Sequence, residues 1–396
     1  MEIHKKQLSK GLLIVSNIIF IVLATTSLLY CDKEKPSLDV PFEGTHPDVV
    51  KSMLELADTN SNDVLYDLGS GDGRIVIMAA QQYNIKRGVG FEIDPQRIEE
   101  ANFRREQLNL METVFFYQKD IFQVNFENAS ILTLYLLDRI NLKLRPKILM
   151  DTKPGTRIVS HAFHMSDWEP DDITHHKKAR KNKILKWIVP ASAGGIWRCQ
   201  YIIDRQIEYR NNIEIVQTFQ TIKGSIIDSD SNNSIEIYDT GLNGKTIHFF
   251  ADLLYNNQKV NVHYKGEIEN NIINGVQIWH INNQEKKYQW YAKRDEIDVS
   301  GIWSINFDSE KHQLDGFLTL NSNDSPIPKA YYDFNINKSR ATLEHVYVWG
   351  SSIYLRLPVG KPNDYFVLTG SLNKMKGSGF VELPKYFFTW SAIRTD

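Results

Sequence analysis

The sequence predicts a doubly wound α/β domain followed by an all-β region that contains a duplication. Three observations lead to this fold class. Short apolar runs alternate with helical segments over residues 41–190, polar and apolar residues alternate singly after Pro190, and four short motifs recur in the same order in two copies. A chain of 396 residues is long enough for two or three domains.

The composition is that of a globular protein without a strongly charged partner. Hydrophobic residues make up 42% of the chain, well above the content of disordered proteins. The 46 basic residues nearly balance the 48 acidic residues. We therefore expect no nucleic-acid partner from the charge.

The first 31 residues predict a membrane-anchoring or signal segment. Residues 11–30 carry no charge, follow three lysines and precede Cys31. A cleaved signal peptide, a bacterial lipoprotein signal with Cys31 as the lipidated residue, and a membrane-spanning helix all fit, and the length suits an anchor. We expect a membrane-tethered protein of the cell envelope, with residues 32–40 as the tether and the side of the membrane left open.

The elements of the α/β part, residues 41–190, follow from periodicity. Residues 46–57 place Val49, Val50, Met53, Leu54 and Ala57 on one helical face. The apolar runs that suit buried parallel strands are 63–69, 87–94, 113–120, 130–137 and 156–163. The helical segments between them are 74–84, 94–109 and 140–153. The last run, 184–191, follows without a helix, so we expect it to return antiparallel as a hairpin.

The all-β region reads as two meanders, residues 194–296 and 300–396. Each copy opens with Gly-Ile-Trp and closes with Trp-x-Ala-x-Arg, and the final arginines are Arg294 and Arg394. The copies either curl into two small barrels or stack as one sandwich, with the tryptophans and arginines packed at the ends. The alternating segments include 213–222, 233–239, 246–254, 259–268 and 288–294.

The stretch "YDLGSGDGRI", residues 66–75, predicts a ligand-binding turn between a strand and a helix. Glycines in such a turn adopt backbone angles closed to other residues and let a ligand approach the main chain. Glu92 ends the next strand, where an acid commonly holds a ribose. Asp120 ends the third strand and is placed to accept from an adenine amino group, with Ile121 and Phe122 flanking the ring.

The spacing of the glycines bears on the kind of cofactor. A dinucleotide fold also uses glycines and a downstream acid, so it stays open at this point. A pyrophosphate site, however, needs its third glycine one turn further on than Gly73. The pattern favours a nucleoside cofactor that carries no phosphates.

Four segments together resemble a known family. They are "PFEGTHPDVVKSML", "VLYDLGSGDGRIVI", "GFEIDP" and "TLYLLDRINLKLRPKILMDTKPGTRIVSHAF". Residues 41–190 resemble the class I, seven-strand, Rossmann-like S-adenosylmethionine-dependent methyltransferases. More narrowly, they are similar to the family of the mitochondrial lysine methyltransferases that act on the ATP synthase c-subunit and on adenine nucleotide translocase, with its bacterial relatives.

The resemblance implies S-adenosylmethionine as the cofactor and assigns roles to the predicted site. It implies that Asp67, Gly69 and Gly71 hold the methionine end. Glu92 would bind both ribose hydroxyls, and Asp120 would face the adenine.

The resemblance also implies a loop that closes over the methionine moiety. Glu43 and Thr45 of "FEGT" match this loop, although many members of the family have Tyr-Val-Pro-Thr there.

The implied activity is methyl transfer to a protein lysine, and Tyr135 is the candidate catalytic-site residue. With Thr133 and Leu136 it ends the fourth strand, where an acceptor channel would begin. Enzymes acting on nucleic-acid bases or glutamine often carry Asn or Asp followed by Pro-Pro-Tyr there, and this chain has "LYLL". His161 and His164 lack a third ligand at a recognisable spacing, so no metal is expected. The alternative is an envelope lipoprotein that uses a methyltransferase-like fold and β modules as a non-catalytic scaffold.

Overall fold

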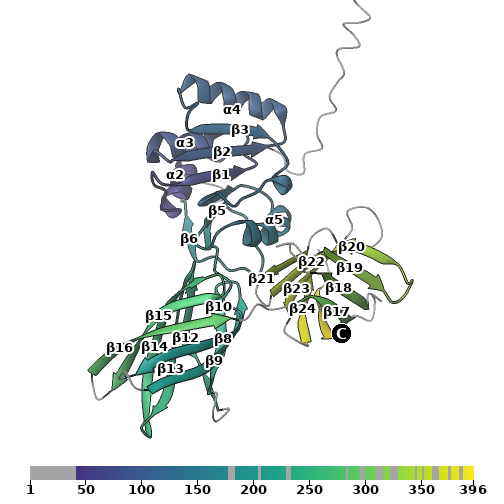
Figure 1. The fold of residues 1–396 in the computed structure, drawn as a ribbon. Coiled ribbons are helices and arrows are strands. Elements are labelled where there is room, and N and C mark those ends of the chain that lie inside the picture. Colours follow the sequence, from purple (N-terminus) through teal and green to yellow (C-terminus); the bar gives the residue numbers. More distant parts are fainter. Residues whose placement is uncertain are drawn as a thin grey trace, which may run out of the picture. The chain divides into compact units, whose positions relative to one another are not determined.

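The computed structural model describes most of the chain after Pro41 (Figure 1). The described residues are 42–176, 183–203, 207–228, 233–281, 284–294, 299–308, 315–321, 329–343, 346–349, 352–358, 365–372, 376–382 and 387–396. The anchor expected at 1–31 and the tether expected at 32–40 lie outside them. None of the helices within the described ranges is long and apolar enough to cross a membrane.

A seven-stranded sheet forms the centre of the α/β part, with strand order β3-β2-β1-β4-β5-β7-β6. Its strands are β1 (Val64–Leu68), β2 (Arg87–Glu92), β3 (Val114–Gln118), β4 (Ile131–Leu134), β5 (Arg157–His161), β6 (Asp172–His175) and β7 (Lys183–Ile188). Strands β1 to β5 pair in parallel, whereas β7 runs antiparallel to β5 and β6. The predicted α/β class and the antiparallel return of the last apolar run are both confirmed.

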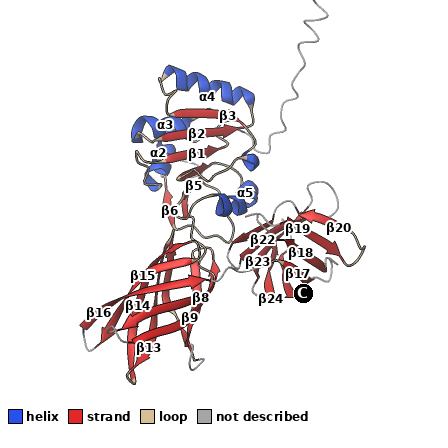
Figure 2. Ribbon diagram, in the orientation of Figure 1, coloured by secondary structure: helices blue, strands red, loops and turns tan. Residues whose placement is uncertain are grey.

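The described residues of this part also form four α-helices and a short 3-10 helix, of which α2 precedes β1 and the others lie between strands (Figure 2). They are α2 (Pro47–Leu56), α3 (Arg74–Tyr83), α4 (Pro95–Gln107), the 3-10 helix η1 (Ile121–Gln123) and α5 (Asp138–Asp151). Helix α4 begins where Asp94 accepts a hydrogen bond from the backbone N–H of Gln96, with proline in the first helical position. Helix α3 ends at Asn84, which adopts the left-handed conformation that stops a helix.

The predicted apolar face of α2 is fully buried. Val49, Val50, Met53, Leu54 and Ala57 all have 0% exposed surface and join the α/β core. Burial of a side chain such as valine or leucine stabilises a fold by roughly 1.5–3 kcal/mol, so this face is sufficient to hold the helix on the sheet.

Two nine-stranded antiparallel sheets follow, as the sequence predicts for an all-β region. The first contains β8 (Gly195–Ile203), β9 (Ile207–Thr218), β10 (Thr221–Asp228), β11 (Ser234–Glu236), β12 (Tyr238–Asn243), β13 (Thr246–Tyr255), β14 (Gln258–Glu269), β15 (Ile272–Ile281) and β16 (Gln284–Arg294). The second contains β17 (Gly301–Phe307), β18 (Gly316–Asn321), β19 (Lys329–Phe334), β20 (Arg340–Leu343), β21 (Val346–Trp349), β22 (Ser352–Pro358), β23 (Tyr365–Leu372), β24 (Lys376–Glu382) and β25 (Phe387–Arg394).

Both sheets have the same connectivity, because the first strand of each pairs with the last. Trp197 on β8 lies opposite Arg294 on β16, and Trp303 on β17 lies opposite Arg394 on β25. Each sheet encloses its own group of buried side chains. The first sheet curls until its ends meet, where the Thr240 hydroxyl on β12 donates to the Ile222 carbonyl on β10 at 2.7 Å.

The motif residues at the start of each sheet make matching contacts. The indole N–H of Trp197 donates to the Ala193 carbonyl at 2.7 Å, and that of Trp303 donates to the Val299 carbonyl at 2.9 Å. The Arg294 guanidinium lies 4.6 Å from the Trp197 ring centre. Burial lowers the pKa of Arg294 to about 10. The expected packing of arginine on tryptophan is therefore present in the first sheet.

One segment differs from the sequence reading. The sequence analysis reads residues 213–222 as one alternating segment, but the structure divides them into β9 and β10 at a two-residue turn, Phe219–Gln220. Phe219 has a backbone φ of 52°, in the left-handed region. The sequence contains no glycine, proline or asparagine at this turn, so local turn chemistry could not reveal it.

Candidate active site

The glycine turn between β1 and α3 requires its glycines. Gly69, Gly71 and Gly73 have φ angles of 79°, 52° and 79°, which side-chain-bearing residues rarely adopt. A Cβ on Gly71 would collide with the ring of Phe42. The backbone N–H of Gly69 donates to the Phe91 carbonyl at 2.9 Å and so ties the turn to the end of β2.

The Glu92 carboxylate is fixed beside this turn. It accepts hydrogen bonds from the backbone N–H groups of Gly71 at 2.9 Å, Ile93 at 2.8 Å and Asp94 at 3.0 Å. A carboxylate has about four lone-pair sites, so Oε2, which accepts only the Gly71 bond among these, can also accept from a hydroxyl. The predicted ribose-binding acid and the glycine turn therefore form one rigid unit.

Asp67 lies at the end of β1 and is almost completely buried, with 2% of its surface exposed. The Thr133 hydroxyl on the neighbouring strand β4 donates to Asp67 Oδ1 at 2.8 Å. Burial raises the pKa of Asp67 to about 7, although the Thr133 hydrogen bond opposes this, and the charges of Glu92 and Asp72 raise it further. A cationic ligand group beside Asp67 would favour its ionised form.

Asp120 and Ile121 follow β3, whose end lies next to that of β2. The backbone N–H of Lys119 donates to the Glu92 carbonyl at 2.9 Å, which brings these two strand ends together. Asp120 Oδ1 accepts from the Phe122 N–H at 2.9 Å, and Ile121 begins the 3-10 helix η1. The structure therefore brings the predicted ribose and adenine residues to the same edge of the sheet.

An ion cluster that the sequence analysis missed holds the entry loop, residues 42–45, against the glycine turn. Arg74 donates to both carboxylate oxygens of buried Asp72 and to the Thr45 carbonyl at 2.9 Å. Arg104 from α4 reaches the same carboxylate at 2.8 Å. Burial opposes ionisation of Asp72, but the hydrogen bonds and charges of the two arginines lower its pKa overall. The only local signal was the Asp-x-Arg spacing within the glycine turn.

The entry loop brings its own aromatic side chain to the turn. The ring of Phe42 lies against Gly71, and the Arg97 guanidinium lies 4.0 Å from the ring centre. Glu43 is exposed on the same loop, while Thr45 is buried with 4% of its surface exposed. Thr45, one of the two predicted loop residues, lies within 3.3 Å of His161 in the aromatic cluster described next.

Tyr135 belongs to an aromatic cluster at the ends of β4 and β5. Its ring stacks on His161 with ring centres 4.1 Å apart, and Phe163 lies 5.9 Å away. His161 Nδ1 lies 3.3 Å from the Thr45 hydroxyl, although the two residues are 116 positions apart. The backbone N–H of His164 donates to Asp138 on α5. No group of three metal-ligating side chains occurs among the described residues.

Helix α5 holds the acceptor loop, which we define as residues 161–167, from His161 at the end of β5 to Asp167. Asn141, which is fully buried, donates to the Phe163 carbonyl at 3.2 Å, and Arg145 donates to the Met165 carbonyl at 2.8 Å. Ala162 and Ser166 within this loop have φ angles of 69° and 56°. Such conformations persist only when surrounding contacts determine them, so the loop is held in one shape. Sequence periodicity marks Asn141 and Arg145 as nothing more than polar positions on a helix.

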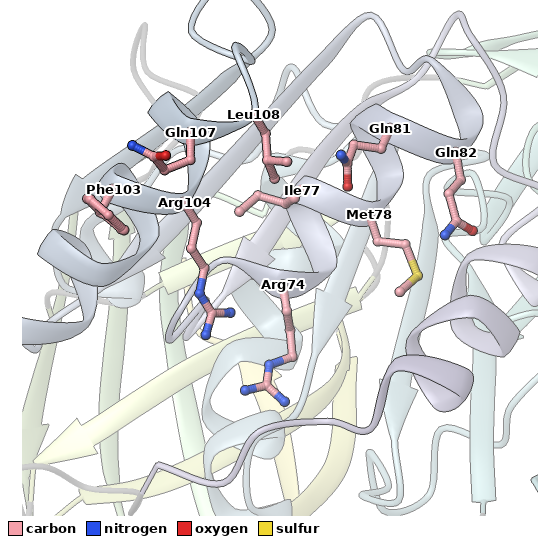
Figure 3. A pocket seen from close by; sticks show the side chains of 9 residues that line it. All are labelled: Arg74, Ile77, Met78, Gln81, Gln82, Phe103, Arg104, Gln107 and Leu108. Carbon is pink, nitrogen blue, oxygen red and sulfur yellow. The ribbon is translucent and has the colours of Figure 1, made fainter.

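A groove of about 410 Å³ runs between α3 and α4, beside the ion cluster of Arg74 and Arg104 (Figure 3). It is lined by Arg74, Ile77, Met78, Gln81, Gln82, Phe103, Arg104, Gln107 and Leu108. None of the predicted cofactor residues lines it, so we assign it no part in the cofactor site.

The chain is similar to known lysine methyltransferases. Residues 67–172 match the family model described as the ANTKMT methyltransferase domain. The protein-lysine N-methyltransferase of Saccharolobus islandicus is 40% identical over 134 residues, which cover 34% of this chain and 83% of that protein. The adenine nucleotide translocase lysine N-methyltransferase of Mus musculus is 29% identical over 34% of this chain and 57% of that enzyme. The human lysine N-methyltransferase named for the ATP synthase c-subunit is 31% identical over 28% of this chain and 46% of that enzyme.

A solved structure also matches this part of the chain. An RNA methyltransferase from Salinibacter ruber, in complex with S-adenosyl-L-homocysteine, is 43% identical in sequence. It covers 37% of this chain and 94% of its own, with a TM-score of 0.36.

Proposed function

The chain belongs to the ANTKMT family of S-adenosylmethionine-dependent methyltransferases, and on this premise we propose that it methylates a lysine side chain of a protein substrate. The observation that carries the proposal is the Glu92 carboxylate bound to the Gly71 N–H, with buried Asp67 and half-buried Asp120 at the neighbouring strand ends. The substrate class rests on the relatives, which are named as lysine methyltransferases. None of these relatives supports the non-catalytic scaffold.

The residues present fit S-adenosylmethionine, which would supply an activated methyl group on its sulfonium. Glu92 retains acceptor capacity for a ribose hydroxyl, and Asp120, with one oxygen bonded to Phe122, retains it for an adenine amino group. Asp67 would hold the cationic methionine end, because a nearby positive charge stabilises its carboxylate. The glycine turn allows the main chain to approach the ligand closely.

Tyr135, His161 and Phe163 would form the wall of the acceptor channel. A lysine amine must be neutral to attack the methyl group, and desolvation by aromatic rings favours the neutral amine. The protein would then mainly align the amine with the methyl group, because the sulfonium already activates the methyl group and would leave as a neutral thioether. The bond between Thr45 and His161 would couple closure of the entry loop to the acceptor wall.

The decisive experiment follows a radioactive methyl group. The purified chain is incubated with tritium-methyl S-adenosylmethionine and extracts of its source cells, and the labelled protein is hydrolysed for amino-acid analysis. We expect the label in methyllysine. Label that nuclease removes and protease does not would instead identify a nucleic-acid substrate and overturn the proposal.

A matched pair of variants links the activity to the site. Glu92→Ala should weaken S-adenosylmethionine binding by at least roughly tenfold, since a charged hydrogen-bond partner contributes about 1.5–3 kcal/mol. Glu99→Ala removes an exposed acid from α4 and should leave binding unchanged in calorimetric titration. Equal affinity for the two variants would contradict the assigned role of Glu92.

The uncharged stretch at residues 11–30 supports a second proposal, that the N-terminal segment tethers the protein to a membrane. Fractionation of cells expressing the whole chain should then recover it with membranes, and a chain lacking residues 1–35 should lose this association. A reporter fused after Asp396 would identify the side of the membrane. Recovery of the whole chain in the aqueous fraction would refute the tether.

A further inference from the structure

The turn between β9 and β10 of the first antiparallel sheet contacts the segment that follows the acceptor loop. The ring of Phe219 stacks on buried Trp168, with ring centres 5.4 Å apart and planes 12° apart. The side chain of Gln220 accepts from the Trp168 indole N–H at 2.8 Å and donates to the Glu169 carbonyl at 2.7 Å. Both residues of the turn therefore bind the α/β part through specific contacts.

The turn has an unfavourable backbone conformation at Phe219. Phe219 has a backbone φ of 52°, in the left-handed region that residues with a side chain rarely adopt. Gln217 supports the turn by donating to the carbonyls of Phe219 at 2.7 Å and Ala191 at 2.9 Å. The stacking and hydrogen bonds at Trp168 compensate for a conformation that glycine or asparagine would adopt more easily.

The same phenylalanine also reaches the residue that holds the acceptor loop. The Arg145 guanidinium lies 5.2 Å from the Phe219 ring centre, and it donates to the Met165 carbonyl and the Asp167 carboxylate. Arg145 is buried, with 3% of its surface exposed. An unbroken series of contacts therefore runs from the β turn through Arg145 to the loop that contains His161 and Phe163.

We propose that Phe219 and Gln220 are positioning residues for methyl transfer, through which the first antiparallel sheet completes the acceptor side of the active site. The inference rests on the proposed lysine methyltransferase function. Neither residue would touch the cofactor or the reacting amine. They fix Arg145 and Trp168, which in turn fix the loop that carries His161 and Phe163 beside Tyr135.

Phe219→Asn in the whole chain tests the proposal, because asparagine tolerates the left-handed backbone but lacks the ring. Hydrogen exchange at the backbone amides of residues 161–169 should become at least roughly tenfold faster. The S-adenosylmethionine Kd should stay unchanged. With poly-L-lysine as the acceptor probe, kcat/KM for the acceptor should fall several-fold, while KM for the cofactor should stay unchanged.

Three further variants separate positioning from general destabilisation. Phe219→Trp should keep both the slow amide exchange and the acceptor kcat/KM of the wild-type chain, because tryptophan also places an aromatic ring against Trp168. Leu254→Ala alters a side chain of the same sheet that is 76% exposed, and should change neither. If Phe219→Asn unfolds the sheet, Gln220→Ala repeats the test by removing only the hydrogen bonds to Trp168 and Glu169.

Unchanged exchange at residues 161–169 in both Phe219→Asn and Gln220→Ala would overturn the inference. The exchange measurement needs no acceptor. If the wild-type chain fails to methylate lysine, the proposed function fails, while the exchange result still decides whether the turn positions the loop.

Discussion

Asp67 shows at the scale of one residue how ligand binding and stability oppose each other. Its buried carboxylate makes a hydrogen bond to Thr133, and burial raises its pKa from 3.8 to about 7. The folded protein therefore binds a proton at Asp67 more tightly than the unfolded chain does. The free energy of unfolding should fall as the pH rises from about 4 to about 7, in the absence of ligand.

We predict that Asp67→Asn stabilises the ligand-free protein above pH 7 and weakens cofactor binding. At about 1.4 kcal/mol per pH unit, the ionisation penalty between pH 3.8 and 7 reaches on the order of 4 kcal/mol. The variant avoids this penalty but loses the charge that would attract the cationic methionine end. Thermal unfolding at pH 4 and pH 8, with titration of S-adenosylmethionine, measures both effects.

The comparison of the two pH values supplies an internal control. Asp67→Asn should raise the unfolding temperature at pH 8 and change it little at pH 4, where Asp67 is protonated in the fold. Glu99→Gln, at an exposed position in α4 beyond the first turn, should leave it unchanged at both. A variant less stable than wild type at pH 8 would show that the Asp67 carboxylate stabilises the fold.

At the scale of elements, the start of α3 connects the glycine turn to the entry loop. Arg74 bonds Asp72 within the turn and the Thr45 carbonyl in the loop, and the ring of Phe42 covers Gly71. A helix start held in this way has one orientation relative to both the cofactor turn and the loop.

We predict that Arg74→Ala releases the entry loop. Amide exchange at residues 43–46 should accelerate, and the S-adenosylmethionine Kd should rise roughly tenfold, the effect of losing about 1.4 kcal/mol. Arg87→Ala is the matched control, because the guanidinium groups of Arg74 and Arg87 both lie over an aromatic ring, of Phe42 and Phe115 respectively, but Arg87 is at an exposed strand start. Unchanged exchange in Arg74→Ala would show that other contacts hold the loop.

At the scale of the whole molecule, the two antiparallel sheets have equal topology and separate cores. The buried cluster of the first sheet spans Ala191 to Ala292, and that of the second spans Val299 to Ala392. Within the described parts of both sheets, the first supplies the turn that contacts Trp168. The two sheets therefore share a strand order, and we assign a role at the active site to the first.

We predict that a chain ending at residue 298 keeps its S-adenosylmethionine affinity and slow amide exchange at residues 161–169. Each sheet buries its own side chains, so loss of the second should not unfold the first. A chain ending at residue 193 removes Phe219 as well and should exchange rapidly at 161–169. Rapid amide exchange at residues 161–169 in the chain ending at residue 298 would assign a positioning role to the second sheet.

Much of the fold was accessible from the sequence, because periodicity records which side of an element is buried. The series of strands and helices, the fully buried face of α2 and the antiparallel return of β7 all matched. The β9–β10 turn was missed, because Phe219 and Gln220 carry no local turn signal and tertiary contacts at Trp168 support the turn. Asp67, Glu92 and Asp120 could be proposed as candidate cofactor residues because each lies at or just after the end of a strand in a parallel sheet.

By itself, the sequence determined the α/β and all-β parts, the glycine turn with its acids, and the duplication, because each depends on residues close together in the chain. Only the tertiary structure decided which distant residues meet. Thr45 reaches His161, Arg104 joins Asp72, and Phe219 stacks on Trp168. Such contacts depend on the order of the strands and on how loops pack across their ends, which hydrophobic periodicity does not encode.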